Sequence, residues 1–266
     1  MSASYLAGQA PDDALIDGWI EQFHRDGCLF LHNVLPPDWI AELRRDLDRV
    51  LDGPDVGSQY EFGGIQLNHR MFETSDANLR LFDIEPIVTF AERLVAEDCH
   101  FIHNNSFRSP TGAAISSWHQ DDPPHFEITH GEAPDNIRLP VLLFTCNYYL
   151  TNVDVVDNGP TQTVPRSHLF GCSPPDPIEG SDYEDQVVSN LGPAGSVIMF
   201  NNQVWHRGAP NTSDLTRYIT QISYARRLVG HKYYPFMNYQ MPEHVYEGAD
   251  ERRRRLLGFL PRGAYG

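Results

Sequence analysis

The second half of the chain most constrains its fold, because it is a series of short strand-like runs. From about residue 100, FIHNNSF, VLLFTCNYYL, SVIMFNNQVWH and RYITQISYAR follow one another, separated by Pro, Gly, Asn and Asp. The first half is different: LIDGWIEQFHRDG and DWIAELRRDLDRVLDG repeat apolar residues at helical spacing. Helices followed by a block of strands predict an α+β, mainly β, domain in which helices buttress a β-sandwich or barrel.

Several residues in the first half indicate where the helices begin and end. Gly27 suits the end of the first helix, and Asp38 and Gly53 suit the N-cap and the C-terminal end of the second. Between these helices, CLFLHNV is apolar and predicted to be extended. A third helix is expected to begin near Pro86, and residues 211–215 are expected to form a tight turn.

The chain shows no internal repeat and no low-complexity linker, which favours a single domain over residues 1–266. We expect a helical part over about 1–98, the strand block over about 99–230 and a C-terminal lid or helix over about 231–266. Within the last part, YYPFMNYQMP (233–242) could be a lid or an oligomer contact. The RRRR run at 252–255 is expected to form the exposed face of a helix.

Composition limits the possible partners. A formal net charge of −16 disfavours nucleic acid and makes a neutral or cationic small molecule more attractive than an acyl-CoA. The cysteines form no CxxC pair, which fits reduced, buried thiols in a cytosolic protein; they are Cys28, Cys99, Cys146 and Cys172. No signal peptide is visible, and no apolar run approaches the roughly 20 residues that span a bilayer. The sequence predicts a cytoplasmic protein without a membrane segment.

The stretch SSWHQDDPPHF contains His119 and Asp121, two residues apart. On a strand, residues at this spacing project to the same face, so an imidazole and a carboxylate could grip one metal ion. An HxD pair alone is a weak signal, and a polar turn would look the same.

Two later residues strengthen the metal hypothesis. His206 closes the strand-like run SVIMFNNQVWH, and Arg217 follows 11 residues later at the start of RYITQISYAR. We expect the turn NTSDLT to bring the strand of Arg217 back antiparallel to that of His206. Two histidines and one carboxylate leave iron positions free for an oxo-acid and O₂. The planar guanidinium could bind the far carboxylate of that acid.

With these residues in place, the chain resembles the phytanoyl-CoA dioxygenase-like family of Fe(II)/2-oxoglutarate-dependent oxygenases. The resemblance lies in EQFHRDGCLFLHNVLPPDWIAELRRDLDRVL, WHQD, DNGPTQTVPRSH and WHRGAPNTSDLTR. It implies a double-stranded β-helix (jelly-roll, cupin-like) core buttressed by N-terminal helices. It also implies that His119, Asp121 and His206 hold iron(II) and that Arg217 anchors 2-oxoglutarate.

The chain departs from the family pattern at two positions. Arg166 stands where PGSH has Gly, either as a cation near the site or in a different turn, and Gly208 stands where a Ser is frequent. Asn147 is predicted to be a second 2-oxoglutarate contact, with Ser116 a weaker candidate. His168 is expected to form a hydrogen bond within its own turn.

The resemblance implies an enzyme that converts 2-oxoglutarate and O₂ to succinate and CO₂ while hydroxylating a small molecule, as in the tailoring of secondary metabolites. Desaturation, cyclisation or epimerisation at the same centre stays open. So do a metal-dependent hydrolase and a non-catalytic jelly-roll metal-binding protein. Asp121 argues against halogenation, because related halogenases have a small residue there. We expect a monomer or homodimer, and NHRMFE (68–73) could line the pocket entrance or pack between helices.

Overall fold

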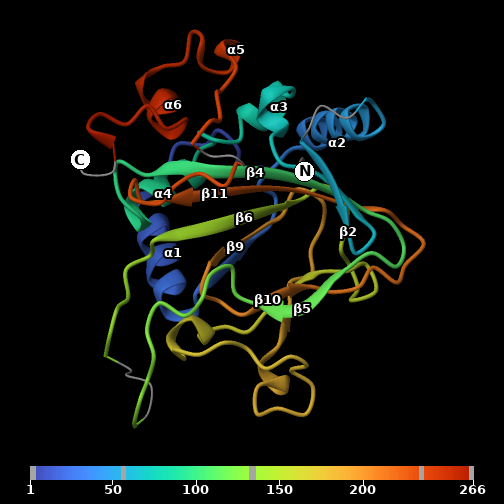
Figure 1. Ribbon diagram of the computed structural model, residues 1–266, viewed down its shortest axis with the longest axis vertical. Helices are drawn as coiled ribbons and strands as arrows, with labels where there is room; N and C mark the ends of the chain where they lie inside the picture. The colour runs from blue at the N-terminus through green and yellow to red at the C-terminus, as the bar shows by residue number, and fades with distance from the viewer. Residues whose placement is uncertain (1–3, 55–57, 132–135, 234–236, 264–266) are drawn as a thin grey trace.

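Two antiparallel β-sheets face each other in the structure, a computed structural model that describes residues 4–54, 58–131, 136–233 and 237–263 (Figure 1). The larger sheet has the strand order β1-β9-β6-β11-β4-β3-β2, and the smaller sheet the order β5-β10-β7-β8. The strands of the larger sheet are β1 (Cys28–Leu31), β2 (Gln59–Phe62), β3 (Ile65–Asn68), β4 (His100–Ser109), β6 (Leu143–Tyr149), β9 (Val197–Asn201) and β11 (Arg217–Ala225). Those of the smaller sheet are β5 (Ile115–His119), β7 (Thr161–Thr163), β8 (Val188–Ser189) and β10 (His206–Gly208).

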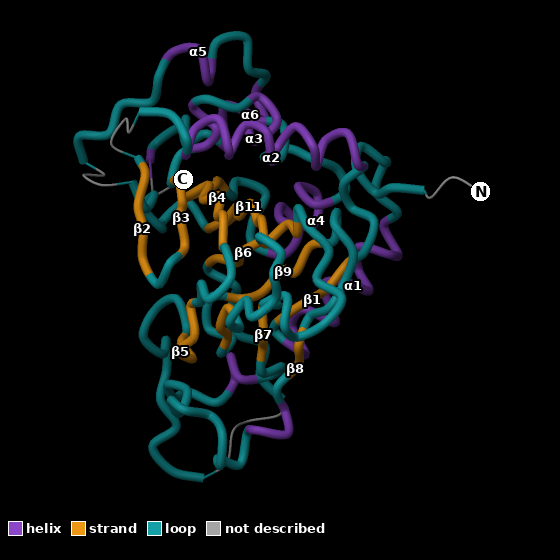
Figure 2. The backbone as a smooth tube through the Cα atoms, turned by 90° about the vertical axis from the view of Figure 1, so that its right-hand side faces the viewer, coloured by secondary structure: helices purple, strands orange, loops and turns teal. Residues whose placement is uncertain are grey.

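The helices gather on the outer face of the larger sheet, away from the smaller sheet (Figures 1 and 2). They are α1 (Asp13–Asp26), α2 (Pro37–Leu51), α3 (Asp76–Leu79), α4 (Ile87–Leu94), α5 (Glu243–Tyr246) and α6 (Glu251–Leu256), with short 3-10 turns at Met71–Glu73, Ser167–Leu169 and Glu184–Gln186. This arrangement confirms the predicted mixed fold, in which helices buttress a two-sheet core. Among the described residues, no helix is both long enough and apolar enough to cross a membrane.

Helix α1 shows how the sequence forms this helical layer. Asp12 caps its first turn by accepting hydrogen bonds from the backbone N–H groups of Ala14 and Leu15. Gly27 ends it in the left-handed conformation (φ 74°), as predicted. Phe23 packs on the aromatic rings of Phe90 of α4 and Phe144 of β6, each with ring centroids 5.7 Å away. The helix is therefore fixed to the larger sheet by its apolar face.

The N-terminal part differs from the prediction in two details. The segment CLFLHNV is extended as expected and forms β1 at one edge of the larger sheet, but β2 and β3, which were not predicted, extend the other edge. Asp38 is not the N-cap of α2: that position is Pro36, and Asp38 lies in the first helical turn. Pro37 at the first helical position accounts for the shift, since its fixed φ suits that position and its missing N–H costs nothing there.

The predicted strand that His206 was to close is in fact two strands in different sheets. Strand β9 ends at Asn201, whose side-chain oxygen accepts a hydrogen bond from the N–H of Gln203 (3.0 Å) and turns the chain. His206 therefore opens β10 rather than closing a strand.

The predicted antiparallel return of β11 on the strand of His206 was also wrong. β11 pairs with β4 and β6 in the larger sheet. The side-chain amide of Asn211 fixes this crossing by donating to the carbonyls of Ser109 (3.0 Å) and Leu215 (2.7 Å). The tight turn expected at 211–215 is present, but it carries the chain from one sheet to the other.

The arginine run of α6 does not form an exposed face. Arg252 forms ion pairs with Glu85 (2.6 Å) and Glu92 (2.5 Å), and Arg253 pairs with Asp83 (2.6 Å). Only Arg254 of the four is exposed. The expected lid at 233–242 includes residues 234–236, which lie outside the described part of the chain.

The cysteines are all free, and their burial differs. Cys99 and Cys146 are buried and Cys28 is partly buried, as the sequence predicts, whereas Cys172 is exposed.

Candidate active site

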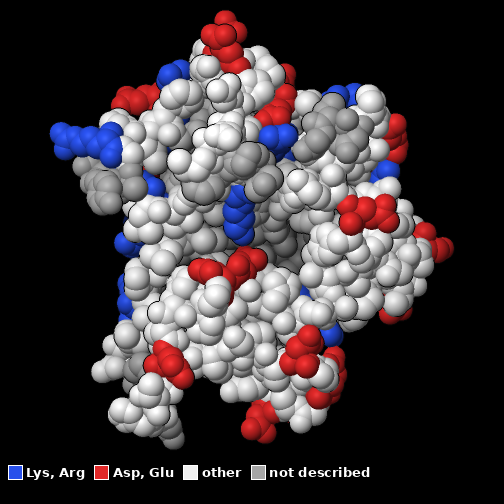
Figure 3. Space-filling view, in the orientation of Figure 1, with Lys and Arg blue, Asp and Glu red and all other residues white. Residues whose placement is uncertain are grey.

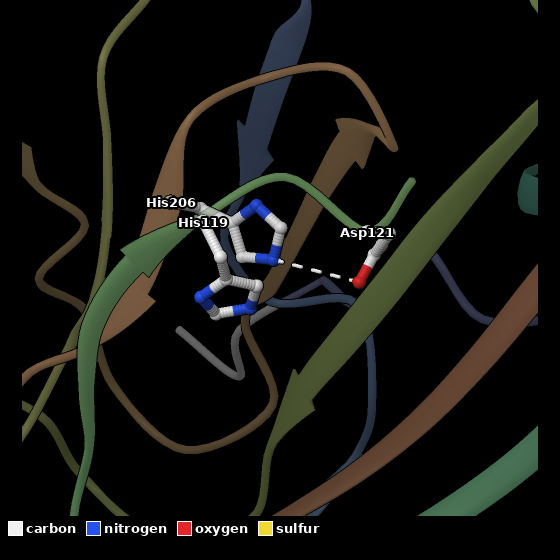
Figure 4. A group of neighbouring side chains, drawn as sticks. All are labelled: His119, Asp121 and His206. Atoms are coloured by element: carbon white, nitrogen blue, oxygen red, sulfur yellow. Dashed lines mark ion pairs between the residues drawn. The ribbon is translucent and has the colours of Figure 1, made fainter. Parts of the chain in front are cut away.

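His119, Asp121 and His206 meet on the inner side of the smaller sheet. His119 ends β5 and His206 opens β10, and the two residues are paired directly across the strands, so their rings lie 4.3 Å apart between centroids (Figure 4). Asp121 lies in the loop after β5 rather than on the strand, and its N–H donates to the carbonyl of Asn202 (2.9 Å). One possible ligand atom from each of the three residues lies within 4.8 Å of the others. This spacing suits one metal ion.

Backbone hydrogen bonds orient both imidazoles and select their tautomer. Nδ1 of His119 lies 2.9 Å from the carbonyl of Ser117, and Nδ1 of His206 lies 2.8 Å from that of Val204. Because a carbonyl only accepts, each Nδ1 carries a hydrogen, and Nε2 is the nitrogen that the neutral ring can offer to a metal. Metal-binding histidines are oriented in this way by a second hydrogen bond.

The local electrostatics also suit a cation. Burial lowers the pKa of His206, which favours its neutral, ligating form. Burial works against the ionisation of Asp121, but His206 and Lys232 outweigh it and lower the pKa of Asp121. Oδ1 of Asp121 lies 3.8 Å from Nε2 of His206. Two imidazoles beside a carboxylate are a donor set that non-haem iron accepts.

The three residues open into a cavity of about 250 Å³ between the two sheets. Figure 3 shows a hollow near the middle of one face, with basic and acidic side chains on its rim. Its apolar lining comes largely from the β2–β3 hairpin and the segment before β5, and includes Phe62, Ile65, Leu67, Phe107, Ala113, Ala114 and Ile115. Its polar lining includes His69, His103, Asn105, Asn147, Thr161, Arg207, Arg217, Gln221 and Lys232.

Arg217 lines this cavity; the residue as a whole is partly buried, and its Nε is buried. One guanidinium NH₂ donates to Oγ1 of Thr161 (3.3 Å), and the guanidinium lies 5.7 Å from the ring centroid of Tyr149. Its Nε has no hydrogen-bond partner, and no carboxylate of the described residues lies within ion-pair distance. Burial lowers its pKa. A buried cation without an anion is costly, so this environment fits an anionic ligand.

A chain of amides forms the cavity floor between β4, β6 and β11. Oε1 of Gln221 accepts from Nε2 of His103 (2.7 Å) and Nδ2 of Asn105 (3.2 Å). Nε2 of Gln221 then donates to Oδ1 of Asn147 (2.9 Å), whose Nδ2 donates to Thr161 (3.4 Å). Asn147 thus lies in the cavity with its amide already hydrogen-bonded to protein groups.

Three of the sequence-based candidates lie elsewhere. Ser116 is exposed and does not line the cavity; its carbonyl accepts from the guanidinium of Arg207 (3.5 Å). Arg166 is exposed and adopts a left-handed φ of 70°, which agrees with a different turn rather than a cation near the site. His168 does not bond within its own turn, because its Nε2 donates to the carbonyl of His24 in α1 (3.2 Å).

Sequence reasoning missed most of the polar cavity lining. His103, Asn105 and Gln221 alternate along β4 and β11 on the inward face, and this alternation was a usable signal once the strands were recognised. Lys232 lies in no recognisable motif, and His69 was predicted only as part of a segment that could line the pocket entrance.

A comparison with family models gives one match, described as "Phytanoyl-CoA dioxygenase (PhyH)", over residues 23–219. The chain belongs to the phytanoyl-CoA dioxygenase family. The matched range contains His119, Asp121, His206 and Arg217, so the family predicted from the motifs is confirmed.

Curated relatives of the chain are named as dioxygenases. An ectoine dioxygenase from Nocardia farcinica is 24% identical over 232 residues, covering 74% of each chain. The dioxygenase trt7 from Aspergillus terreus is 22% identical over 284 residues, covering 92% of this chain and 93% of the relative.

Solved structures confirm the jelly-roll fold. The non-heme alpha ketoglutarate dependent epimerase SnoN from nogalamycin biosynthesis has a TM-score of 0.61 at 19% identity, over 80% of this chain and 82% of SnoN. HygX from Streptomyces hygroscopicus, solved with nickel, 2-oxoglutarate and hygromycin B, has a TM-score of 0.61 at 16% identity, over 77% of this chain and 86% of HygX. The carbocyclase SnoK reaches 0.60 at 16% identity, over 84% and 87%. In this chain the two sheets do not close into a barrel.

Proposed function

We propose that the protein is an iron(II)- and 2-oxoglutarate-dependent dioxygenase that hydroxylates a C–H bond of a small molecule, as a tailoring step on a natural product. His119, Asp121 and His206 would hold the metal, and Arg217 would bind the distal carboxylate of 2-oxoglutarate. Together, iron and 2-oxoglutarate supply the oxidising power for such a step, with succinate and CO₂ as co-products. The observation that carries the proposal is that Arg217 lies in the same cavity as the three ligand residues, with a buried Nε and without an ion pair to any carboxylate of the described residues.

The protein's own groups would position the reactants. The carbonyls of Ser117 and Val204 hold the imidazoles so that each Nε2 is available. The Gln221–Asn147 chain holds the floor of the cavity rigid, and Asn147 remains our prediction for a second cosubstrate contact. The apolar wall at the β2–β3 hairpin keeps water away from the substrate.

The second candidate function is a reaction other than hydroxylation at the same metal centre. The structural relatives include an enzyme described as an epimerase and one described as a carbocyclase. Such reactions differ from hydroxylation in how the substrate is held next to the metal. Once a substrate that the enzyme converts is known, analysis of its product distinguishes these reactions. Of the three, only hydroxylation adds one oxygen atom to the substrate.

The test is anaerobic titration of the protein with iron(II) and 2-oxoglutarate, followed by measurement of succinate after oxygen is admitted. We expect a visible charge-transfer band and succinate formation. The Arg217→Met variant should bind 2-oxoglutarate about a hundredfold more weakly, because a buried ion pair would be lost. Its metal affinity should be unchanged.

Arg226→Met is the matched control, since Arg226 follows the same strand outside the cavity and its Nε donates to the carbonyl of Val141. Equal loss of metal and 2-oxoglutarate binding in Arg217→Met would contradict the assigned role. Absence of both the band and succinate in the native protein would refute the proposed function.

A further inference from the structure

Lys232 is the only lysine of the chain, and it lines the candidate active-site cavity. Of the 20 basic residues, nineteen are arginine. Lys232 follows β11, and its backbone N–H donates to the carbonyl of Ile102 in β4 (2.9 Å). Its side chain shares the cavity with His119, Asp121 and His206. A chain that otherwise uses arginine for every cationic side chain has its single ammonium group at this position.

The other cations of the cavity already have an assigned partner. Arg207 pairs with Glu179 (3.3 Å) and lies over the ring of Trp118. Arg217 is assigned to 2-oxoglutarate in the proposed function. The ammonium group of Lys232 has no hydrogen bond or ion pair with any residue that the structure describes, and the residue is exposed. One positive charge of the cavity is therefore free for a ligand.

Arg217 and Lys232 are anchored at different points along β4. Arg217 pairs in register with Ser109 at one end of β4, whereas Lys232 is bound to Ile102 near the other end. Seven residues of strand separate these points, about 23 Å of backbone at a rise of about 3.3 Å per residue. The ammonium group of Lys232 is therefore available to an anion other than the carboxylate assigned to Arg217. Lys232 nevertheless lines the same cavity as the three candidate metal ligands.

We propose that Lys232 binds a carboxylate of the substrate, so that the cavity accepts a small organic acid with an apolar body. This rests on the proposed function. With a divalent metal and dianionic 2-oxoglutarate in place, Asp121 and Arg217 complete a neutral set of charges, and Lys232 is left to balance one substrate anion. Leu67 of β3 and Phe107 of β4 are paired across the two strands and line the same cavity, so their apolar side chains offer a surface for the body of the acid.

This assignment reverses the expectation from overall charge. A net charge of −16 repels anions at a distance and favours a neutral or cationic substrate. Within the cavity, the nearby charge of Lys232 determines which substrate charge is preferred. Physiological salt, with a Debye length of about 8 Å, screens the remote carboxylates. Lysine suits this position because its compact ammonium group has three donors on a flexible stem and stays hydrated until the ligand arrives.

The single lysine makes a direct binding test possible. Reductive ¹³C-methylation of the intact protein keeps the positive charge and labels only Lys232 and the N-terminal amine. The labelled protein, loaded with metal and 2-oxoglutarate without oxygen, is titrated with 3-phenylpropanoate and, separately, with 3-phenylpropanamide. We expect the Lys232 methyl resonance to shift saturably with the acid and not with the amide, while the N-terminal resonance stays still. No binding of the acid, or an equal response to acid and amide, overturns the proposal.

Two variants complete the test. Lys232→Met should bind 3-phenylpropanoate about tenfold more weakly and the amide unchanged, whereas Lys232→Arg should keep most of the affinity for the acid. If Lys232→Met binds 3-phenylpropanoate with native affinity, the assignment is overturned. It is also overturned if the variant binds 2-oxoglutarate more weakly while its affinity for 3-phenylpropanoate stays native. The charge-transfer band is recorded in the same samples. Its absence in native protein refutes the proposed function, while the shift of the Lys232 resonance still reports on acid binding.

Discussion

Gln203 should control metal affinity without touching the metal, because its side-chain amide holds the loop that carries Asp121. Its Oε1 accepts from the N–H of His125 (2.9 Å) and from Nε2 of Gln120 (3.4 Å). Its Nε2 donates to the carbonyls of Asp122 and Pro123, each at 3.3 Å. Gln203 itself is buried (8% exposed), whereas Asp122 and Pro123, which its amide contacts, are exposed.

The magnitude for Gln203→Leu follows from these contacts. Leucine keeps the volume but removes all four bonds, of which only the 2.9 Å bond is short. Asp122 and Pro123 are exposed, so water can replace the lost donor to their carbonyls. We therefore expect a loss of about 1–2 kcal/mol in the free energy of unfolding, at the lower end for a buried polar group that loses its partners. Because Asp121 becomes less well positioned, metal affinity should fall about tenfold.

The assay combines urea denaturation of the metal-free protein with calorimetric titration of a divalent metal. Gln186→Leu is the matched control, since Gln186 makes one bond on an exposed surface, to the carbonyl of Asp182 (3.2 Å). It should change neither quantity. If Gln203→Leu loses stability but keeps native metal affinity, then the bond from the N–H of Asp121 to Asn202 alone positions the carboxylate, and the reasoning fails.

Three further outcomes are expected. Burial lowers the pKa of His168 from 6.5 to about 4, so the unfolded state takes up a proton first as pH falls. His168 alone should therefore contribute a stability loss of about 3 kcal/mol as the pH falls between these two values. His168→Gln should make the slope of stability against pH shallower in urea titrations, and an unchanged slope would contradict this. Glu92→Gln should lower unfolding stability by about 1–3 kcal/mol, because it weakens the pairing with Arg252, whereas an unchanged midpoint would mean that α6 is held by its apolar contacts. Gly27→Ala should lower the melting temperature clearly, because a Cβ there would lie 2.4 Å from Val204 and φ is +74°; a native melting temperature would refute the stated conflict.

The sequence predicted the fold and the residues that carry local patterns. The helical periodicity of α1 and the apolar strand runs appear in the structure because burial of one face decides each of them. The residues His119, His206 and Arg217 were found because each stands in a recognisable motif next to a strand-like run. The structure brings all three to one cavity.

The features that could not be predicted from the sequence depend on contacts between segments that are far apart in the chain. The crossing of β11 into the other sheet is set by the amide of Asn211 on two backbone carbonyls, one of them 102 residues away in the chain. The burial of the arginine run depends on Glu85 and Glu92, more than 150 residues earlier. The polar floor around Gln221 likewise exists only once β4, β6 and β11 are in register.

The strands of the smaller sheet are short: β5 has five residues, β7 and β10 have three each, and β8 has two. So few backbone bonds leave this sheet prone to local opening. A metal ion held by His119, Asp121 and His206 would tie β5, its following loop and β10 together, and would stabilise the closed state by mass action. For such a protein, scarcity of iron would lower not only the rate of the reaction but also the lifetime of the protein itself, because the opened sheet is where a protease would begin.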